Sequence, residues 1–451
     1  MVEDVRFLDH YRQGLSIMNV QNMTVRHCEF SGTAGILPEA GIDIEPYQTT
    51  QRVVNLLIEN CRFEYNGWSG LAVNLFDLDA TSLPVSITVR DCVFKNNGRE
   101  ENTYVKCEIY ADDNHLSPVQ GEVLFERCFI EESNYGAFYA RKTASGYSLT
   151  FKDCTFQNVS KLPIQYNEPI ALEVADYFNP SPTLGGIHFD NVLIQYDTDY
   201  SFFRVFSAST LAGIENITGH FTIVEPNGNS PILNGNGTQN NIEFTYTNQT
   251  SLPETIVNID VIEQNAVECT QQAGEILFVR NSNNVSYPLG ISYEIGGSAD
   301  NGNDYHYLPQ GIVIPSGANS KKIEILARQD DMEEDAEMAI FTITPSFLYQ
   351  PGNFSTAEIN LWDCEPLSAY EPNTTALELL IYPNPSDNQI TLLLPSTSES
   401  QNILIFNKLG QLIVKHFNLE NNERIVLNIE EIPSGIYFIT YGGFVQKFIK
   451  N

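Results

Sequence analysis

Two carboxylates separated by one apolar residue stand out near the start of the chain, in Gly41-Ile42-Asp43-Ile44-Glu45. Side chains alternate between the two faces of a β-strand, so Ile42 and Ile44 would point into a core. Asp43 and Glu45 would leave the opposite face, roughly 6.5–7 Å apart. Such a pair fits acid/base work on either side of a glycosidic bond, or chelation of Ca²⁺. The plainer interpretation is that both are solvated residues of one strand.

Further polar and aromatic residues recur in short strand-like segments that follow. If these segments are equivalent strands, their outward side chains form one ridge with about 4.8 Å between neighbours. The expected catalytic residues are Asp43, Glu45 and Arg141, and the expected substrate-binding residues are His10, Arg12, Lys106, Glu108, Tyr139 and Gln165. A lyase needs a cationic base and charge neutralisation of a uronate, whereas a hydrolase needs two carboxylates. The chain has residues of both kinds. The alternative to a substrate-binding ridge is an ordinary hydrated face of the repeat.

Two insertions, residues 76–85 and 98–120, interrupt these segments. Loops of this size on one face of a repeat structure usually shape a binding edge. Their charged residues include Asp77, Asp79, Asp112, Asp113 and His115.

A repeat carries these residues. The segments VRHCEF (25–30), IENCRF (58–63), VRDCVF (89–94), FERCFI (125–130) and FKDCTF (151–156) share one pattern, with a degenerate copy, FDNVLI, at 189–194. The repeated positions are Cys28, Cys61, Cys92, Cys128, Cys154 and Val192, spaced by 26 to 38 residues. A unit this short cannot bury its apolar face alone and must stack on its neighbours. The irregular period argues against a propeller, and the absence of amphipathic helical patterns argues against a helical solenoid. The pattern predicts a right-handed parallel β-helix.

Because each coil carries one cysteine at the same position of the motif, we expect the sulfurs to stack on one another. Disulfides and metal binding are the alternatives, but CxxC-type or Cys/His pairs are missing, so small buried core residues are the favoured interpretation. The repeats resemble the pectin-lyase-like family of β-helix proteins over about residues 10–250. That fold hosts lyases, hydrolases, epimerases, tailspikes and adhesins. The combination of Arg12-Gln13-Gly14 with residues 41–46 (GIDIEP) resembles a subgroup associated with polysaccharides.

Residues 268–365 change character, with several short alternating segments separated by turn residues. Such a pattern predicts a β-sandwich. The order G-x-DY, IP-x-G, DD-x-x-E and a final Asp resembles the Calx-β domain, in which carboxylates at one end hold Ca²⁺. The positions that this resemblance implies are Asp304, Asp330, Asp331, Glu334 and Asp363. Converging oxygens suit a cation that takes six to eight ligands. A spacer domain without calcium is the alternative.

The tail, residues 379–451, contains YPNPS (382–386), Leu409-Gly410-Gln411, IPSGIY (432–437) and a basic terminus. This set closely resembles the C-terminal sorting domain of the bacterial type IX secretion system. The resemblance implies export across the outer membrane of a Bacteroidetes-type bacterium and contact with the type IX machinery.

Composition limits the partners. The 451 residues carry a net charge of −33, which opposes binding to nucleic acid or to anionic membrane surfaces. No apolar run is long enough for a transmembrane segment, and the first residues have no signal-peptide pattern. Because the repeat begins almost at once, we expect this sequence to be the C-terminal part of a longer protein, or its start to be misassigned.

The predicted fold class is therefore all-β, with a parallel β-helix followed by two small antiparallel β-sandwiches. The expected domains are 1–255, 266–366 and 376–451. The favoured function is that of a secreted or cell-surface protein that binds extracellular polysaccharide, with cleavage by a lyase or hydrolase mechanism left open. The alternative is a non-catalytic adhesin or structural protein with the β-helix as a stalk. Ca²⁺ is the one expected cofactor.

Overall fold

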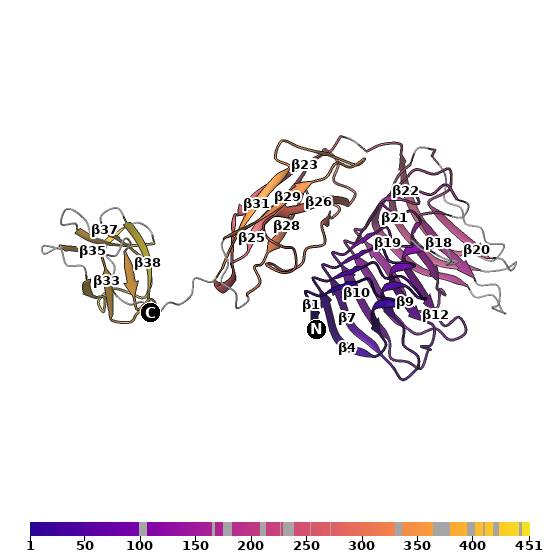
Figure 1. Cartoon of the computed structure of the whole chain (residues 1–451), viewed down its shortest axis with the longest axis horizontal. Coiled ribbons are helices and arrows are strands. Elements are labelled where there is room, and N and C mark those ends of the chain that lie inside the picture. Colours follow the sequence, from indigo (N-terminus) through magenta and orange to yellow (C-terminus); the bar gives the residue numbers. More distant parts are fainter. Residues whose placement is uncertain are drawn as a thin grey trace. The chain divides into compact units, whose positions relative to one another are not determined.

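The protein is built almost entirely from β-strands (Figure 1). The computed structural model describes residues 1–98, 106–164, 167–174, 183–207, 213–225, 227–228, 239–252, 254–270, 272–329, 336–363, 379–394, 402–408, 411–417, 424–441 and 444–451. Contacts divide the chain into two compact units, Met1–Cys364 and Glu365–Asn451.

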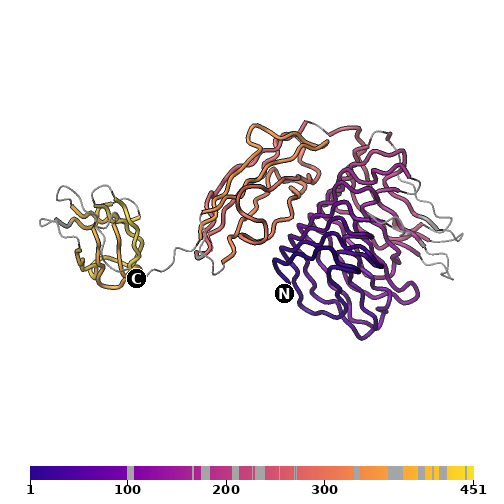
Figure 2. The backbone as a smooth tube through the Cα atoms, viewed as in Figure 1, coloured from indigo at the N-terminus to yellow at the C-terminus, as the bar shows by residue number. Residues whose placement is uncertain are grey.

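The first part of the larger unit is a stack of coils with three parallel faces (Figure 2). The first face contains β1 (Val2–Glu3), β4 (Val20–Arg26), β7 (Val53–Glu59), β10 (Val85–Arg90), β13 (Gly121–Glu126), β16 (Ser148–Lys152) and the start of β19 (Leu184–Tyr196). The second contains β2 (Arg6–Leu8), β5 (Glu29–Ser31), β8 (Arg62–Glu64), β11 (Val93–Lys95), β14 (Phe129–Glu131), β17 (Thr155–Val159) and the end of β19. Strands β21 (Ile214–Val224) and β22 (Gln239–Gln249) continue the stack beyond β19.

The third face is a separate parallel sheet of seven strands. Its members are β3 (Gln13–Ile17), β6 (Ala40–Ile44), β9 (Ser69–Leu75), β12 (Cys107–Asp113), β15 (Gly136–Arg141), β18 (Ile170–Val174) and β20 (Phe203–Ser207). Asp43, Tyr139 and Arg141, which the sequence pattern selected for a ridge, lie on strands of this face.

A left-handed residue precedes each repeated cysteine and turns the chain from the first face to the second. These residues are His27, Asn60, Asp91, Arg127 and Asp153, with φ between 49° and 53°. Residues other than glycine adopt this conformation uncommonly, and Asn and Asp do so more readily than most. Because the same bend occurs in each of these coils, the cysteine that follows it takes the same place in coils of different length.

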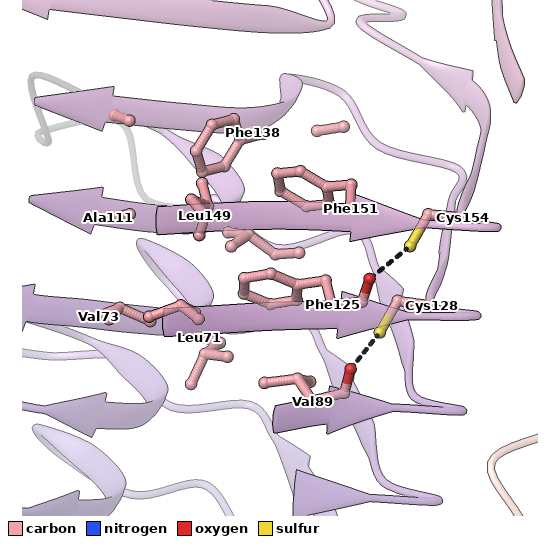
Figure 3. Packing of buried hydrophobic residues seen from close by; sticks show 14 of the residues in the cluster. Leu71, Val73, Val89, Ala111, Phe125, Cys128, Phe138, Leu149, Phe151 and Cys154 are labelled. Atoms are coloured by element: carbon pink, nitrogen blue, oxygen red, sulfur yellow. Dashed lines mark hydrogen bonds between the residues drawn. The ribbon is translucent and has the colours of Figure 1, made fainter. Parts of the chain in front are cut away.

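The repeated cysteines lie in the core, as predicted. All five are buried and free of disulfides. Figure 3 shows Cys128 and Cys154, whose thiols donate to the carbonyl oxygens of Val89 (3.4 Å) and Phe125 (3.5 Å) one coil earlier. Because each sulfur packs on the previous coil, the column joins neighbouring repeats.

Stacked aromatic rings reinforce the same core. The Phe63 ring lies parallel to those of Phe30 and Phe94, with centroid distances of 5.0 and 4.7 Å. Such pairs add to the stabilisation that burial alone provides.

A sandwich of two mostly antiparallel sheets follows the coils. One sheet contains β23 (Ile256–Glu263), β25 (Gly274–Asn281), β28 (Ser320–Ile325) and β30 (Gln350–Pro351), and the other contains β24 (Asn265–Val267), β26 (Leu289–Gly297), β27 (Gly311–Ile314), β29 (Glu337–Ile343) and β31 (Thr356–Trp362). The expected domains left residues 256–265 between them unassigned, but β23 lies there and pairs with β25. A short 3-10 helix, Glu268–Thr270, separates β24 from β25.

The sandwich contacts the second face of the coils. Val93 and Phe129 form a buried cluster with Val313 of the sandwich. The buried guanidinium of Arg62 donates to the carbonyl oxygen of Pro309 at 2.7 Å. Sequence elements more than two hundred residues apart thus share one interior.

The smaller unit contains two antiparallel sheets. They are formed by β32 (Leu380–Tyr382), β33 (Gln389–Leu393) and β36 (Arg424–Asn428), and by β34 (Asn402–Asn407), β35 (Leu412–Phe417), β37 (Gly435–Tyr441) and β38 (Phe444–Lys450). The predicted fold class, a parallel β-helix followed by smaller antiparallel β-structures, is confirmed.

Candidate functional site

A cleft of about 490 Å³ opens on the outer surface of the third face, beside the 76–85 insertion. It is lined by Arg12, Leu37, Pro38, Glu45, Pro46, Trp68, Asn74, Phe76, Asp77, Tyr110, Asp112 and Arg141. Aromatic rings, carboxylates and arginines thus converge in one concave place, which is the usual composition of a ligand site.

One outward column supplies the charged residues of this cleft. Asn74 pairs with Asp112, and Asp112 pairs with Arg141 on the next strand. Glu45 follows Ile44, whose partner is the residue before Asn74. Because side chains at matching positions of parallel strands share a face, Glu45, Asn74, Asp112 and Arg141 project in one row.

Asp112 is set up to hold a proton. Its carboxyl group accepts hydrogen bonds from the Tyr110 hydroxyl (3.2 Å) and from the backbone N–H of Leu75 (3.0 Å). Burial and the charge of neighbouring Asp113 nevertheless raise the pKa of Asp112 to about 8. A carboxyl group that is protonated at neutral pH can serve as a proton donor.

Glu45 lies at the opposite side of the same cleft. Its carboxylate accepts a hydrogen bond from the Tyr47 hydroxyl at 2.9 Å and lies 3.9 Å from the Arg12 guanidinium. Arg12 is further held by a hydrogen bond from Nε to the carbonyl oxygen of Leu37. The predicted residues Glu45, Arg12 and Arg141 are therefore brought together.

Asp43 does not lie on a solvated surface as expected. It leaves the outer face of β6, as the alternation predicts, but its side chain is 0 % exposed. Asn74 donates a hydrogen bond to its Oδ1 at 2.7 Å, and its Oδ2 has no hydrogen-bond partner among the described residues. Burial, and then the charge of Glu45, raises the pKa of Asp43 to about 7. Asp43 thus lies behind the cleft rather than in its lining.

The aromatic residues form a layer on the outer face. The Trp68 ring lies 4.8 Å from that of Tyr110, which in turn stacks on Tyr139 at 6.0 Å. Trp68 and Tyr110 line the cleft, whereas Tyr139 is buried and donates its hydroxyl hydrogen bond to Glu173. The expectation that Tyr139 is exposed for substrate is therefore wrong. The Tyr139 ring instead packs against the Tyr110 ring within the aromatic layer.

Glu108 belongs to the interior, contrary to the expectation of an exposed side chain. Its carboxyl group accepts hydrogen bonds from the backbone N–H (3.1 Å) and side-chain amide (2.5 Å) of Asn97. Asn97 in turn accepts hydrogen bonds from Asn66 of the preceding coil, so Glu108 belongs to a buried polar ladder that joins neighbouring coils. Burial raises the pKa of Glu108 to about 7.

The other predicted substrate contacts lie elsewhere. Lys106 donates to the Tyr135 hydroxyl at 3.1 Å and does not line the cleft, and His10 is exposed outside it. Gln165 lies outside the described residues.

The calcium prediction is only partly covered by the described chain. Asp304 and Asp363 are described, whereas Asp330, Asp331 and Glu334 lie outside the described residues. The Asp304 carboxylate accepts a hydrogen bond from the backbone N–H of Asp300 at 2.6 Å.

A different acidic group, Glu3 with Asp4 and His306, has ligand atoms within 4.8 Å of one another. Both carboxylates already have hydrogen-bond partners, since Arg26 donates to Glu3 and the His306 ring bonds Asp4, each at 2.6 Å.

Sequence reasoning missed three cleft residues, Trp68, Asn74 and Asp112, as members of the site. Asp112 was expected in an inserted loop, but it lies on strand β12. The signal was available in the alternation from Ile109 to Asp112, which continues the outward column of Glu45.

Comparisons with known proteins agree with this architecture. Residues 1–116 match the family model of the right-handed beta helix region, and residues 380–450 match that of the secretion system C-terminal sorting domain. A search of curated proteins found no match.

The chain is also similar to solved structures. The apo form of the Calx CBD1 domain is 20% identical over 24% of this chain and 96% of that domain, with a TM-score of 0.21. CBD12 from CALX1.2 is 16% identical over 41% of this chain and 79% of its own, with a TM-score of 0.24. The E. coli chaperone DraB is 12% identical over 44% of this chain and 98% of its own, with a TM-score of 0.19.

Among the described residues, no helix has the length and apolar character needed to cross a membrane. The chain joins a right-handed β-helix to a type IX C-terminal sorting domain, and it is a protein that is secreted or attached to the outer cell surface.

Proposed function

We propose that the protein binds an extracellular polysaccharide in the cleft of the third face. The observation that carries this proposal is the single row of Glu45, Asn74, Asp112 and Arg141 beside the rings of Trp68 and Tyr110. Carboxylates, an amide and a guanidinium are suited to sugar hydroxyls and carboxylates, while the rings offer flat apolar surfaces for the sugar ring.

A second candidate, cleavage of the glycan, is favoured by the state of Asp112. With its pKa raised to about 8, Asp112 carries the proton that a leaving glycosidic oxygen needs. Glu45 would accept a proton from the water that attacks the anomeric carbon, so the bond to the leaving sugar breaks as the bond to water forms. The two residues project from strands two positions apart, about 9–10 Å between backbones, which leaves room for that water.

This arrangement favours hydrolysis over elimination. A lyase needs a base that takes a proton from the sugar ring, and Arg141 stays charged. The Arg141 guanidinium lies 3.5 Å from the Glu173 carboxylate, so its role would be to position substrate through charge.

The test is a screen of the protein against neutral and acidic polysaccharides, with binding and product formation measured separately. Trp68→Ala should weaken binding at least about tenfold, because it removes a stacking surface. Asp112→Asn should leave binding intact while lowering turnover about 10²-fold or more. His10→Ala is the matched control, since His10 is exposed and outside the cleft. Binding to no glycan would overturn the proposal and leave the adhesin or stalk as the better hypothesis.

A further inference from the structure

A second cleft, of about 620 Å³, lies where the β-helix meets the sandwich. One wall comes from β11, β14, β17 and β19, and the other from residues 344–347 of the sandwich. It is separate from the cleft of the third face, because the two share no lining residue.

The β-helix wall is a polar column. Lys95 pairs with Glu131, Glu131 with Gln157, and Gln157 with Gln195 across successive strands. Glu131 is held by Lys95 at 3.3 Å and accepts a hydrogen bond from the Ser292 hydroxyl of the sandwich. The two domains are thus fixed to each other at the edge of this cleft.

Gln157 is the unusual member of this column. It is only 5 % exposed, and its Oε1 has no hydrogen-bond partner among the described residues. A buried amide oxygen without a partner is costly, and such groups are uncommon in folded proteins. Since Gln157 lines the cleft, a ligand hydroxyl or amide that donates to Oε1 would remove this cost.

The charge of the cleft limits what can enter. Glu131, Glu132, Asp197 and Glu225 line it, with Lys95 as the one cation among its described lining residues. This excess of carboxylates repels an anionic ligand such as a uronate-rich chain. Carboxylates and amide oxygens accept hydrogen bonds, which suits a ligand rich in hydroxyl donors.

The sandwich wall adds an aromatic surface. Phe347 lines the cleft and is 67 % exposed, next to Thr344 and Ser346. An exposed ring of this size at the rim of a polar cleft is suited to packing on the apolar face of a sugar ring.

We propose that this seam is a second glycan site, which binds a neutral oligosaccharide or the end of a neutral polysaccharide chain. It requires both domains, since the β-helix supplies the acceptors and the sandwich supplies the ring. The inference does not depend on the cleft of the third face.

The test titrates the protein with xylotriose, cellotriose and mannotriose, and with trigalacturonate as the acidic comparison, with calorimetry as the measurement. At least one neutral trisaccharide should bind, and trigalacturonate should not bind in this cleft. Phe347→Ala should weaken neutral binding at least about fivefold. Phe354→Ala is the matched control, because Phe354 is a 70 % exposed ring of the same sandwich that does not line the cleft.

Gln157→Leu provides a second, independent change on the opposite wall, and it should also weaken neutral binding. Absence of neutral binding at millimolar concentration would overturn the proposal. So would neutral binding that neither Phe347→Ala nor Gln157→Leu weakens, or equal loss in Phe354→Ala.

Discussion

The side-chain amide of Asn74 donates a 2.7 Å hydrogen bond to the buried carboxyl group of Asp43. Asn74 belongs to the row of residues that lines the cleft, whereas Asp43 lies behind it. The bond therefore fixes the orientation of a cleft amide from a position that solvent and substrate do not reach. We infer that Asp43 acts by positioning Asn74.

Two substitutions of Asp43 test whether its acceptor oxygen, rather than its charge, stabilises the protein. Asp43→Asn keeps an oxygen for Asn74, so its free energy of unfolding should stay close to that of the wild type at about pH 5. Asp43→Ala leaves the Asn74 amide without its acceptor and should cost about 1–3 kcal/mol. Urea unfolding of the two variants checks this, and equal stability of both would contradict the positioning role.

The pH dependence of stability follows from the raised pKa values of buried carboxyl groups. Asp112 has an ordinary pKa of 3.8 and a folded pKa of about 8, so the folded state holds a proton that the unfolded state has released. The stabilisation is full below about pH 4 and is lost as the pH rises towards 8. Asp112→Asn should flatten this decline in thermal unfolding measured across that range.

Asp77→Asn is the matched control for this slope, since Asp77 is an exposed carboxylate of the same cleft. A wild-type stability that rises steadily between about pH 4 and pH 8 would contradict the raised pKa of Asp112. If glycan cleavage is found, turnover should fall above about pH 8, where Asp112 loses its proton.

The repeat allowed the coil stack to be predicted because it recurs in the residues that a coil must bury. Val25, Cys61 and Phe94 occupy the first, fourth and sixth positions of the motif in three of its copies, and each is buried. Alternation also placed Asp43 on the correct face of its strand. It could not show what covers that face, because covering groups come from other coils and from inserted loops.

Glu108 shows where alternation itself fails. Cys107 and Tyr110 both belong to the outer cluster although an even spacing is required for one face, so the alternation breaks between them. Glu108 can then turn inward to Asn97. A local break in the alternation of this kind depends on the neighbouring coil and leaves no mark in a single motif.

The cysteine column predicts a specific stability pattern. Cys61 is fully buried between the sulfurs of its neighbours, and burial raises its pKa well above the usual value. Cys61→Ala should lower the free energy of unfolding by about 1–3 kcal/mol, and Cys61→Val should be better tolerated. Thiol titration of the native protein should leave all five repeated cysteines unlabelled, and rapid labelling of all five would contradict their place in the core.

The contact between β-helix and sandwich rests partly on Arg62. Its guanidinium donates to Pro309 of the sandwich and to Glu64, each at 2.7 Å, and is almost fully buried. Arg62→Ala leaves the Pro309 oxygen and the Glu64 carboxylate without this partner, so we expect a loss of about 3 kcal/mol. Calorimetry should show the sandwich unfolding at a lower temperature than in the wild type.

Arg90→Ala is the matched control for that contact. Arg90 pairs with Glu59 within the β-helix and its side chain is 40% exposed, so its removal should cost less than about 1 kcal/mol. Similar losses in the two variants would mean that Arg62 contributes no more than a surface ion pair.

The calcium prediction can be tested through binding to the native state. If the predicted carboxylates gather at one end of the sandwich, they repel one another without a cation, and a ligand that binds only the folded protein raises its unfolding temperature. Millimolar Ca²⁺ should therefore stabilise the protein, and Mg²⁺ should do so less because it demands stricter octahedral geometry. The double variant Asp330→Asn with Asp331→Asn should abolish the gain, and Asp304→Asn should reduce it. Asp260→Asn, which removes an exposed carboxylate of the same sandwich outside the predicted set, should retain it. An unfolding temperature that Ca²⁺ does not change would identify the sandwich as a spacer.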